Sequence, residues 1–94
     1  MEPEVAFGLV LRELRKRQKL SQETLALESG MERNYVSLLE LGRNSASVKM
    51  IFKIAPVLGV SVADFMALVE ARTKEKNKPK STIKGELDRS SQTA

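Results

Sequence analysis

The chain has 94 residues, enough for one domain at most, and 16 basic against 12 acidic side chains give it a formal net charge of +4. It contains no His, Cys or Trp, which excludes disulfides, thiolate metal sites and a Ser-His-Asp arrangement. No apolar run approaches the roughly 18 residues of a membrane span, and the acidic start is unlike a signal peptide. We therefore expect a soluble cytoplasmic protein that is not an enzyme and uses no metal or cofactor.

The positive charge is concentrated at the C-terminal end. Residues 1–71 carry nine basic and nine acidic side chains, whereas residues 72–94 carry seven basic and three acidic ones. The last segment has few apolar residues and is rich in Lys, Ser and Thr, so it cannot bury enough surface to offset the entropy of ordering. We expect a folded domain over residues 1–72 and a disordered basic tail over residues 73–94.

The first predicted element is a helix from about residue 3 to residue 18. Its apolar side chains have the i, i+3, i+4, i+7 spacing of one helix face. These residues are Phe7, Val10, Leu11 and Leu14. Pro3 suits the first turn, and the basic residues between positions 15 and 19 suit the negative end of the helix dipole.

Four further helices are expected, because four segments share one start signal. In each, a cap residue follows an apolar residue, and a second apolar residue lies five positions after the first, as in a hydrophobic staple. The caps are Ser21, Ser47, Ser61 and the weaker Glu32. Three glycines, Gly30, Gly42 and Gly59, follow the expected helix ends, where left-handed geometry is favoured. No segment alternates with period two, so the fold class is all-α.

The apolar pattern also predicts one core. Its members are Phe7, Leu11, Leu14, Leu20, Leu25, Ala26, Val36, Leu39, Ile51, Ile54, Leu58, Val60 and Phe65. Pro56 breaks a local rule, because it falls inside the fourth helix pattern and removes an amide donor there. A kinked or early helix end is expected, and we interpret Pro56 as an irregularity of the last turn.

Residues 21–41 contain the pattern that indicates function. An eight-residue helix is followed by a turn at Gly30 and a second short helix, and the small Ala26 suits a close helix crossing. Val36 and Leu39 anchor the second helix on the core. The opposite face then presents Arg33, Asn34, Ser37 and Leu38 outward. Such a helix-turn-helix places its second helix in the major groove of DNA.

With these residues, the sequence resembles the Cro/repressor-type (XRE-like) helix-turn-helix family over residues 7–66. The matching stretches include Phe7-Gly8, Leu20-Ser21-Gln22-Glu23, Leu25-Ala26, Val36-Ser37, Gly42-Arg43 and Leu58-Gly59-Val60-Ser61. The resemblance implies a five-helix domain that binds double-stranded DNA, usually as a homodimer on a partly palindromic operator. Apolar residues on the fifth helix would suit the dimer contact. The implied function is a sequence-specific transcriptional regulator, usually a repressor.

The resemblance also implies residue roles. The base-contacting face would be Arg33, Asn34, Ser37 and Leu38 on a recognition helix over residues 33–41. Phosphate contacts would come from Gln22, Tyr35 and Arg43. Arg15 and Glu40 match an ion pair of the scaffold. By side-chain chemistry, Arg33 suits guanine, Asn34 suits adenine and Leu38 suits a thymine methyl group.

The sequence leaves alternatives open. Ala46 stands where the family often has proline. Together with Pro56 it affects the orientation of the fourth and fifth helices. Arg33 and Asn34 could form a plain solvated helix face. The whole chain could be a protein-partner module, such as an antitoxin that autoregulates through the same domain. The tail is interpreted as solubilising, with extra phosphate contacts as the alternative.

Overall fold

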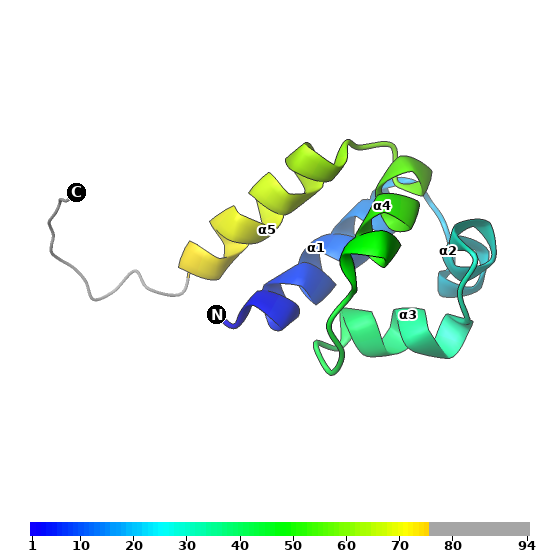
Figure 1. Cartoon of the computed structure of the whole chain (residues 1–94), viewed down its shortest axis with the longest axis horizontal. Helices are drawn as coiled ribbons and strands as arrows, with labels where there is room; N and C mark the ends of the chain where they lie inside the picture. The colour runs from blue at the N-terminus through cyan, green and yellow to red at the C-terminus, as the bar shows by residue number, and fades with distance from the viewer. Residues whose placement is uncertain (76–94) are drawn as a thin grey trace, which may run out of the picture.

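The computed structural model describes residues 1–75, which form five α-helices and no strand (Figure 1). The helices are α1 (Pro3–Arg17), α2 (Gln22–Ser29), α3 (Arg33–Glu40), α4 (Val48–Val57) and α5 (Val62–Glu75). The all-α, five-helix prediction is confirmed. α1 and α5 lie side by side, and α3 lies along the lower edge of the molecule in the view of Figure 1.

The helix starts follow from their caps. The hydroxyl groups of Ser21, Ser47 and Ser61 accept the backbone N–H three residues on, at 3.0, 3.1 and 2.9 Å. Each bond satisfies one of the free amides of a helix N-terminus. Glu32 makes no side-chain cap bond, as its weaker capping chemistry predicts.

Helices α1 to α4 end through one shared backbone arrangement. A residue with positive φ follows each helix, and the next N–H bonds back to the carbonyl five positions earlier, as in a Schellman motif. The three predicted glycines fill this place after α2, α3 and α4. After α1 it is filled by Lys19, with φ 61°, the only non-glycine residue with positive φ among the described residues.

The core lies among the five helices, with α1 packed against α3 and α5, and α2 packed against α3 and α4. Most of the predicted core residues are buried, and the rings of Phe7 and Phe65 lie 5.0 Å apart between α1 and α5. Leu20, Ile51 and Val60 were predicted to be core residues but are only half-buried. Leu20 and Val60 lie in short connections, and Ile51 lines a surface hollow. Helical periodicity did not pick out three other buried residues, Ala6, Ala55 and Val69. Val10, on the predicted apolar face of the first helix, is buried as well, although it was not among the predicted core residues.

Pro56 is tolerated near a helix end. It is the penultimate residue of α4, which ends at Val57. The next amide, of Leu58, donates to the carbonyl groups of Ile54 and Ala55 at 3.2 and 3.1 Å. The proline therefore removes one donor in the last turn without a break earlier in the helix.

The last helix runs past the predicted domain boundary at residue 72. Arg72 donates to both carboxylate oxygens of Glu13 at 2.7 Å, which ties the last turns of α5 to α1. The hydrogen bond to Glu13 raises the pKa of Arg72 above its ordinary value. The amino group of Met1 also donates to the Thr73 carbonyl, at 3.3 Å. The rest of the predicted tail, residues 76–94, lies outside the described residues.

No single helix within residues 1–75 has the length and apolar character to cross a membrane. α4 and α5 satisfy that test only when they are taken together, and they meet at a bend of 105°.

Candidate nucleic-acid interface

The turn between α2 and α3 fixes the relative orientation of the two helices of the motif. Gly30 has φ 72°, a conformation that residues with a side chain rarely adopt, and this allows the chain to reverse tightly. Ala26 on α2 and Val36 and Leu39 on α3 are buried. These side chains hold the inner face of α3 against the core.

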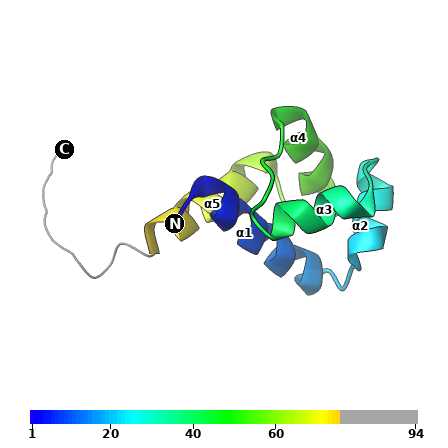
Figure 2. The same ribbon diagram turned by 90° about the horizontal axis from the view of Figure 1, so that it is seen from below.

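The outer face of α3 carries the four predicted base-contacting residues. Arg33 and Asn34 are exposed, and Ser37 and Leu38 are half-buried. At 100° per residue these four positions share one side of the helix, opposite the side of Val36 and Leu39. Figure 2 shows α3 in front of α1 when the molecule is viewed from below. The structure thus brings the four side chains together on one face of a surface helix.

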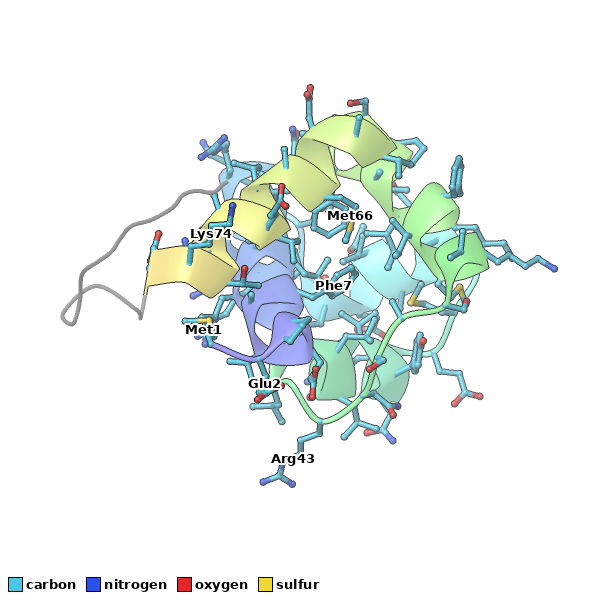
Figure 3. The ribbon with its side chains drawn as sticks, turned by 60° about the vertical axis from the view of Figure 1, so that its left-hand side comes forward. Met1, Glu2, Phe7, Arg43, Met66 and Lys74 are labelled. Atoms are coloured by element: carbon cyan, nitrogen blue, oxygen red, sulfur yellow. The ribbon has the colours of Figure 1, made fainter. Side chains whose placement is uncertain are left out.

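The three predicted phosphate-contacting residues come from α2, from α3 and from the segment that follows α3. Gln22 is the first residue of α2 and is half-buried. Tyr35 lies on α3, and its hydroxyl group donates to the carbonyl of Ser45 at 3.4 Å. Arg43 follows α3 and is exposed, and Figure 3 shows its side chain extending away from the body. Of these three, Gln22 and Tyr35 already make hydrogen bonds within the protein.

A buried ion pair connects α1 to the end of α3. The guanidinium group of Arg15 donates through Nε to Glu40 Oε2 and through Nη2 to Glu40 Oε1, at 3.0 Å for the second bond. Its third contact is the Leu20 carbonyl, at 2.8 Å. Both partners are among the buried residues. Removal of one partner of such a pair typically costs about 3–5 kcal/mol, because the other charge is left buried.

Gly8 is a site residue that the sequence reasoning did not single out as structural. A Cβ atom at this position would lie 2.3 Å from the Leu39 carbonyl oxygen and 2.7 Å from that of Glu40. The backbones of α1 and α3 are therefore in direct contact. The available signal was a glycine beside Phe7 on an otherwise apolar helix face.

A polar hollow of about 350 Å³ lies beside the end of α3. It is lined by Glu4, Gly42, Arg43, Asn44 and Ser45. Glu4, from the first turn of α1, was not expected near the site. Among residues 1–75, no group of three or more acidic side chains is placed to hold a metal ion.

A first helix packed on the core through one face, a tight turn and a surface helix with a polar outer face define a helix-turn-helix protein. The family model described as helix-turn-helix matches residues 11–65, and the chain belongs to this family.

Curated relatives and solved structures agree with this assignment. The control protein C.MunI from a Mycoplasma species is 33% identical over 67 residues, which cover 70% of this chain and 90% of that protein. The restriction-modification controller protein C.AhdI from Aeromonas hydrophila is 44% identical, with a TM-score of 0.64 over 66% of this chain and 94% of that one. The clp gene regulator ClgR from Corynebacterium glutamicum is 27% identical, with a TM-score of 0.71 over 85% and 98% of the chains. The chain is thus a transcriptional regulator of the helix-turn-helix type.

Proposed function

We propose that this protein binds a specific, partly palindromic site in double-stranded DNA as a homodimer and represses transcription there by blocking polymerase. The observation that carries the proposal is the single outer face of α3. That face groups Arg33, Asn34, Ser37 and Leu38 on a helix whose inner side is fixed to the core. We also propose that the protein acts in the cytoplasm and catalyses no reaction.

The side chains on this face have the chemistry that reads base edges in the major groove. The guanidinium group of Arg33 can donate two hydrogen bonds to one guanine, and the amide of Asn34 can bond bidentately to adenine. Leu38 offers an apolar contact to a thymine methyl group. Gln22, Tyr35 and Arg43 would contact phosphates on either side and fix the register of α3 on the duplex.

The distribution of charge supports a specific regulator. Residues 1–71 have equal numbers of acidic and basic side chains. A neutral domain gains little from general attraction to the phosphate backbone, so its affinity depends on contacts at one site. The likeness to the controller protein C.AhdI favours a controller of the restriction-modification kind.

Selection of bound duplexes from a random DNA pool at physiological salt tests this function. We expect two related half-sites with centres about ten base pairs apart, because two copies of α3 must enter successive major grooves on one side of the helix. A pool without any enriched sequence would contradict the proposal. A protein that co-purifies with the chain would then support the partner-module alternative.

Arg33→Ala is expected to weaken binding at the selected site. Loss of the guanine contact is expected to cost about 1–3 kcal/mol at the selected site and to relax one base position. Binding of duplexes substituted at each position would be measured by competition. Arg43→Ala is the matched control, since loss of a phosphate contact weakens binding to all sequences alike. Uniform weakening by Arg33→Ala would instead place Arg33 on the backbone.

A further inference from the structure

Three helices meet at one buried carboxylate. Glu40 is the last residue of α3, and its side chain is 4% exposed. Its Oε1 atom accepts hydrogen bonds from Arg15 Nη2 and from Gln22 Nε2, each at 3.0 Å. α1, α2 and α3 are thereby joined through the carboxylate of the recognition helix.

The contribution of Gln22 to this network differs from that of Arg15. The guanidinium group of Arg15 already balances the charge of Glu40, so the amide of Gln22 adds a donor without a second positive charge. A hydrogen bond to a charged group is stronger than one between neutral groups. Gln22 is also the first residue of α2, so its position fixes the start of α2 against the end of α3.

The amide nitrogen of Gln22 has a second N–H group. Only one of the two can donate to Glu40 Oε1, and the side chain is half-buried at the edge of the predicted interface. In the proposed complex, this second N–H is the group that would reach a phosphate. One nitrogen atom would then bond to DNA and to the carboxylate that ends the recognition helix.

We infer that Gln22 is a positioning residue for sequence recognition. Its hydrogen bond to Glu40 fixes the position of α3 in the major groove. The inference rests on the proposed function. It states that Gln22 changes the discrimination between sequences, and not only the overall affinity. A residue that only contacts phosphate has no such effect.

The test compares Gln22→Met with Gln18→Met in the full chain. Methionine keeps the length of the side chain and removes the donor. Gln18 is the matched control, because its amide also donates to an oxygen at 3.1 Å, but that oxygen is the Leu58 carbonyl, remote from α3. The affinities for the selected duplex and for a scrambled duplex of equal length would be measured at one salt concentration, with thermal unfolding in parallel.

We expect Gln22→Met to lower the ratio of specific to nonspecific affinity about tenfold, the factor that one charge-assisted hydrogen bond supplies. Gln18→Met should leave that ratio unchanged. Gln22→Met and Arg33→Ala should also be non-additive at the selected site, because the guanine contact of Arg33 depends on the placement of α3 that Gln22 fixes. If the Gln22→Met protein does not fold, Gln22→Ser replaces it in the test. The serine side chain is too short to reach Glu40, so the same loss in the ratio of specific to nonspecific affinity is expected.

Other outcomes overturn the inference. Equal loss of both affinities, with additive effects of the two substitutions, would make Gln22 a phosphate contact alone. Unchanged affinities with a lower unfolding temperature would make it purely structural. If the unsubstituted protein enriches no sequence, the proposed function fails, and the inference fails with it.

Discussion

Gly8 and Glu40 together set the distance between α1 and the recognition helix. Gly8 lets the two backbones touch, since a Cβ atom there would lie within 3 Å of two carbonyl oxygens of α3. Glu40 adds the ion pair with Arg15 at the same crossing. The atoms that a side chain at position 8 would meet are backbone atoms, so they cannot move aside as a flexible side chain could.

Gly8→Ala is therefore expected to destabilise the protein, although alanine normally stabilises a helix interior relative to glycine. The overpacked crossing should cost about 1–3 kcal/mol in the free energy of unfolding, measured by urea denaturation. Arg12→Ala, at an exposed position of α1, is the control and should change it by about 0.5 kcal/mol or less. Equal or greater stability of Gly8→Ala would show that α1 and α3 separate freely.

For single residues, the sequence could predict which face of α3 is outward, but not every hydrogen bond that holds the helix in place. The outward positions follow from helical spacing once Val36 and Leu39 are taken as core residues. The resemblance to a family supplied the Arg15–Glu40 pair. The bonds from Gln22 to Glu40 and from Tyr35 to Ser45 depend on how whole helices pack, because the partners are 18 and 10 residues apart.

Two helices, α1 and α3, begin without a side-chain cap bond, and α3 also lacks an acidic residue in its first turn. Ser21, Ser47 and Ser61 cap α2, α4 and α5, whereas Glu32 gives α3 no side-chain cap bond. These starts could be predicted because capping is local chemistry. The last turns of α5 could not, because they depend on the contact between Arg72 and Glu13, which are 59 residues apart.

Glu32→Ser is expected to stabilise the protein by about 0.5–1 kcal/mol, since serine would accept a backbone N–H at the start of α3. Urea denaturation measures this gain. Ser47→Ala is the matched control and should lose about 1 kcal/mol, because it removes a cap that is present. A loss of stability in Glu32→Ser would show that the carboxylate already stabilises the helix start through the helix dipole.

For the whole molecule, the surface beside α5 is the part most suited to a second copy. Met66 is 37% exposed and lies between two hollows of about 530 and 160 Å³, both of which also include Pro3 and Val69. Figure 3 shows Met66 on the same side of the molecule as Phe7, which lines the smaller hollow. This apolar surface supports the proposed dimer contact through α5.

Met66→Lys is expected to leave the domain folded but to shift it to monomer, because a charge would be buried at the contact. Sedimentation equilibrium would measure the assembly state, and binding to the selected duplex should weaken in parallel. Leu27→Lys is the control, since Leu27 is 80% exposed on α2, away from α5. A dimer that persists in Met66→Lys would place the contact elsewhere.

The inner and outer faces of α3 have separate roles, and this has a practical consequence for redesign of the protein. Val36, Leu39 and Glu40 face the interior, whereas Arg33 and Asn34 are exposed and Ser37 and Leu38 are half-buried. Substitutions at the four outer positions leave the core and the buried ion pair unchanged. A library varied only at these positions would consist mostly of folded proteins, and selection from it on new DNA targets could reprogram the regulator without repair of its scaffold.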